Sequence, residues 1–232
     1  AEEPVLRGVC FEAKPAEVTA IIGGTGAGKS TLVNLIPRFY DPEEGAILVD
    51  GVDIRQMAQE DLRRRLGFVP QRAVLFNDTI AANIRFGKED ASDEEVARAA
   101  QTAQALEFIL AMPQGFQSMI AQGGTNLSGG QKQRLAIARA LVREPEIYVF
   151  DDAFSALDFK TDAALRAALR RRTAQSTLII VSQRVNTVMD ADRIIVLEDG
   201  RVVGMGRHRE LVRECQVYRE ILSSQLSEEE LA

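Results

Sequence analysis

One segment near the N-terminus contains the clearest structural signal in the chain: Ala20-Ile21-Ile22-Gly23-Gly24-Thr25-Gly26-Ala27-Gly28-Lys29-Ser30-Thr31-Leu32. The apolar run 18–22 predicts a buried strand, and the residues that follow Lys29 predict the start of a helix. Between the two lies the spacing G-x-x-x-x-G-K-S, which binds phosphate groups when it connects a strand to a helix. The segment therefore predicts a phosphate loop.

The residue types in this loop suit an anionic ligand. Glycines let successive backbone N–H groups turn inward and form an anion-binding nest, and the helix N-terminus adds a partial positive charge. We expect Lys29 to reach the β- and γ-phosphates and the Ser30 hydroxyl to ligate Mg²⁺. The alternative is a glycine-rich turn that binds nothing. The predicted contact residues are Gly23, Gly24, Thr25, Gly26, Ala27, Gly28, Lys29, Ser30 and Thr31.

Composition limits the classes of protein to which the chain can belong. Its 232 residues are enough for one large α/β domain or two lobes, and 46% hydrophobic residues suit a packed core. A net charge of −6 argues mildly against nucleic acid as the main partner, because no basic excess is available to neutralise phosphates. Cys10 and Cys215 lie far apart, so we expect a reduced, cytosolic setting. We expect neither a transmembrane helix nor a signal peptide.

Strand and helix patterns alternate along most of the chain. Short apolar runs bounded by turn residues predict strands, and the segments between several of them show helical periodicity. Such alternation predicts an α/β fold with a mostly parallel sheet. Beyond 18–22, the predicted strands lie at 66–71, 147–150, 177–181 and 193–197.

Two features interrupt this alternation. Residues 5–11 and 45–50 are predicted as short strands of a small antiparallel β layer beside the nucleotide. The middle third lacks strand pattern, and Ser92-Asp93-Glu94-Glu95 resembles a helix capping box. We therefore expect one domain with an inserted α-helical subdomain. The predicted division is a core at about 1–75 and 143–205, a helical subdomain at about 76–142, and C-terminal helices at about 206–226.

Further motifs follow the phosphate loop in a specific order. Gln71 stands at a strand end, Leu127-Ser128-Gly129-Gly130-Gln131 precedes a predicted helix, and Ser155-Ala156-Leu157-Asp158 follows the strand that ends in Asp151. In these motifs and over nearly all of its length, the chain closely resembles the nucleotide-binding domain of ATP-binding cassette (ABC) transporters. The Leu-Ser-Gly-Gly-Gln signature is the discriminating element, since phosphate loops alone occur in many ATPases and GTPases.

The resemblance implies a P-loop NTPase core of the RecA-like kind. Leu75-Phe76, Thr79-Ile80 and Asn83-Ile84, together with Ala121-Gln122-Gly123-Gly124, look like the exporter branch of the family. In that branch the domain follows a membrane domain on one polypeptide, so we expect a site of action at the cytoplasmic face of a membrane. The chain begins after the position of the aromatic residue that stacks on adenine in relatives, and we therefore expect a fragment or an excised domain.

The resemblance also implies a site shared between two domains. Two such domains close head to tail over two ATP molecules, each held between the phosphate loop of one domain and the signature of the other. Gln71 would sense Mg²⁺ and the γ-phosphate, and Asp158 would connect the two sites at the interface. A simpler role for Ser128, the capping of a helix, is compatible with this one. The implied Mg²⁺ ligands are Ser30, Gln71 and Asp151, and the implied contacts to the partner's nucleotide are Ser128, Gly129, Gly130 and Gln131.

Two positions depart from the family pattern, and both belong to the implied catalytic group of Gln71, Asp152 and Gln183. The residue after Asp151 is normally Glu, the general base, and here it is Asp152. The switch position is normally His, and here it is Gln183. An Asp carboxylate falls short of a Glu carboxylate by about 1 Å, while a base needs contact with its water at about 3 Å. Gln183 can donate a hydrogen bond but cannot carry a charge.

The signature is intact while the base and the switch are altered, which matches the degenerate half of heterodimeric exporters. We expect the chain to bind ATP and Mg²⁺, to hydrolyse ATP slowly, and to complete the site of a partner domain whose Glu and His are intact. Neutral variation is the alternative at Asp152, which could act through a bridging water. Two other functions stay open: a nucleotide-gated interaction module without hydrolysis, and a soluble, non-transport ABC ATPase.

Overall fold

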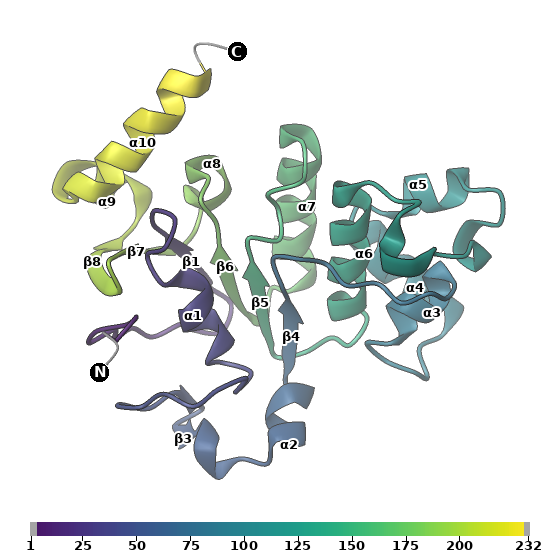
Figure 1. The fold of residues 1–232 in the computed structure, drawn as a ribbon, viewed down its shortest axis with the longest axis horizontal. Helices are drawn as coiled ribbons and strands as arrows, with labels where there is room; N and C mark the ends of the chain where they lie inside the picture. The colour runs from purple at the N-terminus through teal and green to yellow at the C-terminus, as the bar shows by residue number, and fades with distance from the viewer. Residues whose placement is uncertain (1–3, 230–232) are drawn as a thin grey trace.

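The computed structural model describes residues 4–229 of the chain. Within them, a six-stranded sheet has the strand order β4-β5-β6-β1-β7-β8, shown in Figure 1. Every neighbouring pair from β4 to β7 is parallel, and β8 is antiparallel to β7. The predicted α/β class with a mostly parallel sheet is confirmed. The strands are β1 Val18–Ile22, β4 Leu66–Val69, β5 Ile147–Asp151, β6 Thr177–Val181, β7 Arg193–Glu198 and β8 Arg201–Gly206.

The central strands are buried on both faces, as expected of a parallel sheet covered by helices. Successive side chains of β1 point to opposite faces. Ile21 packs with Val33 of helix α1 (Lys29–Asn34) in one cluster, whereas Ile22 packs with Val188 and with Tyr218 of the C-terminal helix in another. Alternate residues of one strand thus hold the phosphate-loop helix and the C-terminal helix on opposite sides of the sheet.

Helices on one side of the molecule form a separate group beyond the β4 edge of the sheet (Figure 1). They comprise α3 Ile80–Arg85, α4 Asp93–Thr102, α5 Leu106–Ala111 and α6 Gly129–Leu141. The predicted capping box at Ser92 is confirmed, because Ser92 Oγ accepts from the Glu95 N–H at 3.2 Å and the Ser92 N–H donates to Glu95 Oε2 at 2.7 Å. The division of the chain at about residues 75 and 143 stays a prediction.

The remaining elements connect and cover the sheet. A two-stranded antiparallel sheet pairs β2 with β3, and its turn at Asp50-Gly51 has positive φ at both residues, as the tight hairpin turn requires. The bounds are α1 Lys29–Asn34, β2 Leu48–Val49, β3 Val52–Asp53, α2 Gln59–Arg64, α7 Phe159–Arg172, α8 Val185–Val188, α9 His208–Glu214 and α10 Gln216–Glu229.

Two strand predictions need correction. The strand predicted at 5–11 is wrong: the segment is irregular, with Gly8 at φ +61°, and the Arg7 N–H donates to the Gly200 carbonyl. Its apolar side chains, Val9 and Phe11 among them, pack on the face of the sheet that α1 covers, which explains an apolar pattern without strand pairing. The strand predicted at 45–50 is shortened to β2, because the hairpin partner β3 pairs only with its last part.

Candidate nucleotide-binding site

The predicted phosphate loop connects β1 to α1 at the carboxyl edge of the sheet. A Cβ atom at Gly23 would collide with the Leu197 carbonyl oxygen, so only glycine lets the loop lie this close to β7. Gly28 stands before the first residue of α1 with φ +96°, a conformation that favours glycine. Between these fixed points, the loop turns back on itself through a hydrogen bond from the Ala27 N–H to the Gly24 carbonyl. Gly24, Thr25 and Gly26 are exposed and accessible to a ligand.

Lys29 lies under this loop and is only 8% exposed. Its ammonium donates to the carbonyl oxygens of Gly23 at 2.8 Å and Gly24 at 2.7 Å. An ammonium has three N–H donors, so one donor remains for an anionic ligand. Burial lowers the pKa of Lys29, although the nearby carboxylates of Asp152 and Asp151 oppose this shift. An added phosphate would favour the charged form further.

Ser30 and Asp151 meet although they are far apart in sequence. The Ser30 hydroxyl donates to Asp151 Oδ1 at 3.1 Å. Asp151 ends β5, and the carboxyl ends of parallel strands meet at one edge of a sheet, where α/β proteins bind their ligands. Burial raises the pKa of Asp151. A hydroxyl and a carboxylate that share space beside a phosphate loop are a donor set that Mg²⁺ accepts, with phosphate oxygens and water completing its coordination.

Protein atoms alone do not form a complete metal cage here. Within residues 4–229, no group of three or more His, Cys, Asp or Glu side chains could hold a metal ion. This agrees with the behaviour of Mg²⁺, which keeps several waters and is bound through one or two carboxylates together with substrate phosphates. The residues present therefore fit Mg²⁺ as the companion of a bound triphosphate.

Gln71 and Asp152 form the next layer of the site. Gln71 follows β4, and its Nε2 donates to Asp152 Oδ2 at 3.3 Å. Asp152 is 8% exposed and has φ +47°, a left-handed conformation in which Asp is more frequent than most residues. Burial raises the pKa of Asp152, and the hydrogen bond from Gln71 opposes this shift. The structure thus brings Lys29, Ser30, Gln71, Asp151 and Asp152 together at one edge of the sheet.

Gln183 follows β6 at the same edge. The preceding residue, Ser182, donates its N–H to the Ile21 carbonyl at 3.1 Å, which places this chain end beside β1 and the phosphate loop. The Gln183 side chain is exposed. Its backbone carbonyl accepts a hydrogen bond from Gln225 of α10 at 2.6 Å. In contrast to Gln71, Gln183 is not joined to Asp152 by a hydrogen bond within the described part of the chain.

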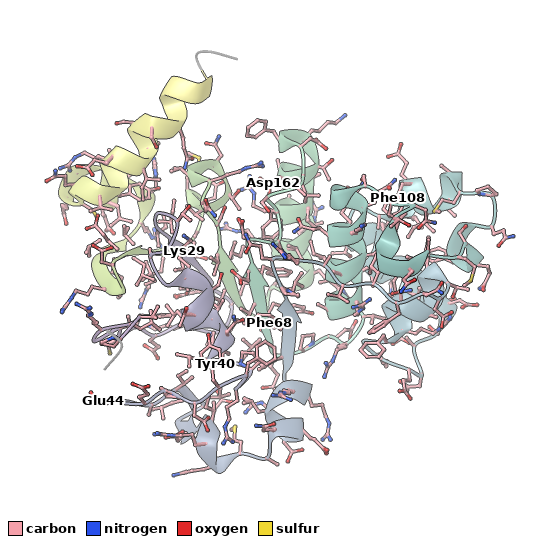
Figure 2. All side chains as sticks on the ribbon, in the orientation of Figure 1. Lys29, Tyr40, Glu44, Phe68, Phe108 and Asp162 are labelled. Atoms are coloured by element: carbon pink, nitrogen blue, oxygen red, sulfur yellow. The ribbon has the colours of Figure 1, made fainter. Side chains whose placement is uncertain are left out.

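The signature lies away from the phosphate loop of its own chain. Figure 1 places α6, which begins at the signature, on the other side of β5 and β6 from α1. In Figure 2, Lys29 and Phe108 mark these two regions. Ser128 caps α6 as predicted: its Oγ accepts from the Gln131 N–H at 3.2 Å, and its own N–H donates to Gln131 Oε1 at 2.9 Å. Ser128 and Gly129 are exposed.

A second exposed helix start lies beside the signature. Asp158 caps α7 by accepting the Thr161 N–H at 2.9 Å, and the hydrogen bond from that N–H lowers the pKa of Asp158. A Cβ atom at Gly130 would lie 3.0 Å from the Ala156 carbonyl oxygen, so the two loops touch. Ser128 to Gly130 and the loop that ends in Asp158 therefore form one continuous surface.

The structure also identifies residues that the sequence analysis missed. Gln133 Nε2 donates to the Gln71 carbonyl at 3.0 Å and so connects α6 to the end of β4. The Arg184 guanidinium donates to the carbonyls of Leu157 at 3.1 Å and Ser155 at 2.8 Å. Gln133 lies two residues after the signature, and Arg184 lies next to Gln183. Their closeness to these motifs could have identified both as candidate site residues. No pattern in the sequence marks Gln225.

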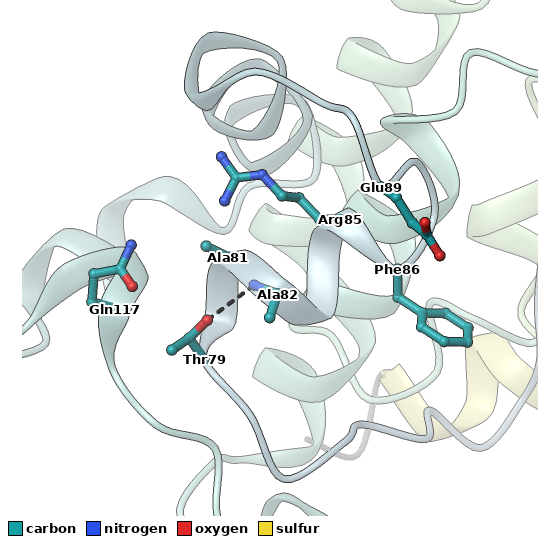
Figure 3. A pocket seen from close by; sticks show the side chains of 7 residues that line it. All are labelled: Thr79, Ala81, Ala82, Arg85, Phe86, Glu89 and Gln117. Carbon is teal, nitrogen blue, oxygen red and sulfur yellow. Dashed lines mark hydrogen bonds between the residues drawn. The ribbon is translucent and has the colours of Figure 1, made fainter.

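A surface hollow of about 310 Å³ lies elsewhere, on α3. Figure 3 shows its lining residues, which include Arg85, Phe86 and Glu89, and the hydrogen bond from the Ala82 N–H to Thr79 Oγ1 at 3.0 Å. None of the predicted site residues lines this hollow. The nucleotide site is thus an exposed loop at the sheet edge and is distinct from this depression.

A strand, a glycine-rich loop with Lys and Ser at the start of a helix, and a Ser–Asp contact to a neighbouring strand together define a P-loop protein that binds nucleoside triphosphates. Comparison with protein families narrows this class, because the model of the ABC transporter family matches residues 6–155. The chain belongs to the ABC transporter family.

Individual relatives agree with this family. The chain is 48% identical to an uncharacterised ABC transporter ATP-binding protein of Mycobacterium tuberculosis over 97% of its length. It is 44% identical to the ATM1-type heavy metal exporter of Novosphingobium aromaticivorans over 98% of its length. A solved structure of a bacterial Atm1-family ABC exporter with ATP bound matches 95% of the chain with a TM-score of 0.93 and 45% identity.

The chain is thus similar throughout to the nucleotide-binding domain of Atm1-type exporters. It spans only 39% of the Mycobacterium relative, 37% of the Novosphingobium relative and 39% of the solved exporter chain. Among the helices of residues 4–229, none has the length and apolarity needed to cross a bilayer.

Proposed function

We propose that this chain is the ATP-binding domain of an ABC exporter that holds Mg-ATP firmly and hydrolyses it poorly at its own site. The observation that carries the proposal is the convergence of Lys29, Ser30 and Asp151 beneath the phosphate loop, next to an Asp at the position of the general base. The second part depends on Asp152 and Gln183, which stand where the family has Glu and His.

The proposed binding step uses groups that are already in place. Exposed loop N–H groups bind phosphate oxygens, and the remaining donor of Lys29 adds a charge-assisted hydrogen bond. Ser30 and Asp151 hold Mg²⁺, which neutralises part of the triphosphate charge when bound. Ligand binding also offsets an unfavourable feature of the free chain, because two buried carboxylates lie close enough to repel each other and Lys29 compensates only in part.

The proposed slow hydrolysis follows from the short side chain of Asp152, which does not bring its carboxylate to the attacking water. A general base must contact the attacking water at about 3 Å, and a misplacement of about 1 Å can cost roughly 100-fold in rate. Asp152 is shorter than Glu by one methylene, and its carboxylate is already engaged by Gln71. The raised pKa of Asp152 strengthens it as a base, but basicity does not restore the missing distance. Gln183 can still donate to a γ-phosphate without adding charge.

We further propose that the signature serves a second domain. Ser128, Gly129 and Asp158 are exposed at the starts of α6 and α7, two helices that Figure 1 shows apart from α1. Head-to-tail closure would place the Ser128 hydroxyl and the Gly129 N–H on a nucleotide held by the partner. A partner with Glu and His intact would then hydrolyse its ATP with help from this chain, so that the proposed assembly is a heterodimer with one degenerate site.

The proposed membrane attachment is indirect. The exporter relatives are longer than this chain, and we propose that a transmembrane domain outside it holds it at the cytoplasmic face of a membrane. Phe86, which lines the hollow on α3, is 64% exposed, and Val74 is 63% exposed. The Phe76 ring lies against the Phe86 ring, with centroids 4.5 Å apart and a tilt of 46° between the ring planes. This apolar surface is the proposed contact for that domain, through which ATP-driven closure would move the membrane part.

The test is ATP turnover by the purified chain, measured as phosphate release together with the amount of ATP bound. We expect stoichiometric binding and very slow turnover. The double variant Asp152→Glu with Gln183→His should raise turnover at least tenfold, since two copies each retain a signature and could complete each other's sites. Brisk turnover by the wild-type chain would overturn the proposal of an impaired site. Lys29→Ala is the control that should remove binding.

A further inference from the structure

One side chain of the C-terminal helix forms hydrogen bonds with the backbone of residues 182–185, here called the switch loop. Gln225 lies on α10, and its amide grips the loop at two points: Nε2 donates to the Gln183 carbonyl at 2.6 Å, and Oε1 accepts from the Val185 N–H at 2.8 Å. Gln225 is half-buried. A primary amide is suited to this task because it offers a donor and an acceptor side by side. The backbone is thereby fixed on both sides of Arg184.

The same loop is held from the opposite direction by Arg184. Its guanidinium donates to the carbonyls of Ser155 and Leu157, in the loop that leads to Asp158. The Arg184 N–H also donates to Ser182 Oγ at 3.0 Å. Three consecutive residues of the switch loop are therefore tied either to α10 or to the proposed domain interface.

The helix that presents Gln225 is anchored independently of it. Tyr218 of α10 is fully buried in the cluster that covers β1 and β7, and its hydroxyl lies 2.8 Å from His208 Nδ1. Ile221 and Leu222 pack against the same cluster. The two amide hydrogen bonds are thus an addition to a helix that is already docked, and their loss should leave the fold intact.

We infer that Gln225 is a positioning residue for Gln183, and that through it the C-terminal helix sets how strongly the site distinguishes ATP from ADP. The inference rests on the proposed function, because it requires Gln183 to meet the γ-phosphate. Gln225 fixes the orientation of the Gln183 backbone and so limits the directions its exposed side chain can take. ADP lacks the γ-phosphate, so its binding should not depend on this grip.

The coupling has a consequence for regulation. Thermodynamic linkage is reciprocal. If the docking of α10 increases the affinity for the γ-phosphate, a bound γ-phosphate must stabilise the docked position of α10 by the same free energy. Any partner that pulls α10 from the switch loop would therefore release ATP preferentially. Arg184 extends this effect to the loop that ends in Asp158.

The experiment compares dissociation constants of Mg-ADP and of the Mg complex of a β,γ-imido ATP analogue for the 232-residue chain and three variants. Gln225→Met keeps the length of the side chain but removes both hydrogen bonds. We expect it to reduce the preference for the analogue roughly tenfold (about 1.4 kcal/mol), the size of one or two net hydrogen bonds, with unchanged ADP affinity. The preference of Gln225→Glu for the analogue should lie between those of the wild-type chain and Gln225→Met, because Glu keeps the acceptor for the Val185 N–H.

The matched control is Gln216→Met, on the same helix. Within residues 4–229 the Gln216 amide donates only to Glu220, so this variant should leave the affinity for both ligands unchanged. If Gln225→Met retained the wild-type preference, or weakened ADP and the analogue equally, the inference would fail while the proposed function stood. If the wild-type chain bound neither nucleotide, both would fail. Amide hydrogen exchange gives a second readout: the analogue should protect the Val185 N–H in the wild-type chain and not in Gln225→Met.

Discussion

At the residue scale, the site places two carboxylates side by side, which lowers the stability of the ligand-free chain. Asp151 and Asp152 are consecutive, both are more than nine-tenths buried, and burial raises the pKa of each. The positive charge of Lys29 offsets part of the repulsion between the carboxylates, but two of its three N–H groups donate to loop carbonyls. Such an arrangement is unfavourable until a ligand with its own cation arrives, as is common where proteins bind highly charged substrates.

The variant Asp151→Asn should therefore stabilise the ligand-free chain. A raised pKa in the folded state means that the folded chain keeps this proton at a pH where the unfolded chain has lost it. Stability consequently falls as pH rises from the ordinary value of 3.8 towards the raised pKa, and Asn removes that loss. We expect a melting temperature about 2–4 °C higher at pH 7.5, with a smaller gain at pH 4, close to the ordinary pKa of the group.

Thermal unfolding at the two pH values, with and without Mg-ATP, measures this effect. Mg-ATP should stabilise the wild-type chain and not the variant, because Asn cannot replace the charge that holds the cation. A variant that melted below the wild-type chain at pH 7.5 without ligand would show that the buried Asp151 carboxylate does not destabilise the ligand-free chain.

Residues of the site differ in how well the sequence could predict them. Lys29 and Ser30 are fixed by the register of one short motif, and the contact of Ser30 with Asp151 follows from the rule that parallel strands end at a common edge. Gln225 could not be found in this way. Its partners lie 40 and 42 residues away, and its position depends on how α10 docks, which no local pattern encodes.

At the element scale, the chain contains two matched helix starts. Ser128 on α6 and Ser92 on α4 each form a complete capping box, with Gln131 and Glu95 respectively. Either cap, when replaced by Ala, should cost about 1 kcal/mol of stability, because an N–H of the first turn loses its acceptor. Only the Ser128 cap lies in the signature, so the pair separates a structural role from a binding role.

The prediction is that Ser128→Ala abolishes ATP-dependent association of two copies of the chain, whereas Ser92→Ala preserves it. Both variants should lose similar stability in chemical denaturation. Sedimentation velocity with Mg-ATP, compared with Mg-ADP, measures the association. Equal loss of association in both variants would mean that the helices matter only through stability, and that the signature hydroxyl has no part in the interface.

Elements were predictable to the extent that local pattern decided them. The runs that form β1 and β6 are buried on both faces, and their mainly apolar sequence predicted them within a residue. The segment 5–11 has equally apolar residues, yet it packs on the sheet without joining it, and Gly8 leaves the extended region. The antiparallel β8 was missed because it is an edge strand with a partly exposed, alternating pattern.

At the scale of the whole molecule, the phosphate loop and the signature lie in separate regions of the chain. The phosphate loop with Asp151 and Asp152 lies at the edge of the sheet, while Ser128 and Asp158 form a separate exposed surface. Under the proposed function, a single chain binds a nucleotide and a second domain is needed to enclose it.

The central claim is that the chain keeps ATP intact at its own loop. The direct measurement is to mix the purified chain with radiolabelled Mg-ATP, remove free nucleotide by rapid gel filtration, hold the complex at working temperature, and identify the nucleotide that remains bound. The account predicts that wild-type chain retains ATP over many minutes, whereas Asp152→Glu with Gln183→His converts it to ADP. Bound ADP as the main species in the wild-type chain, without any partner domain, would contradict it.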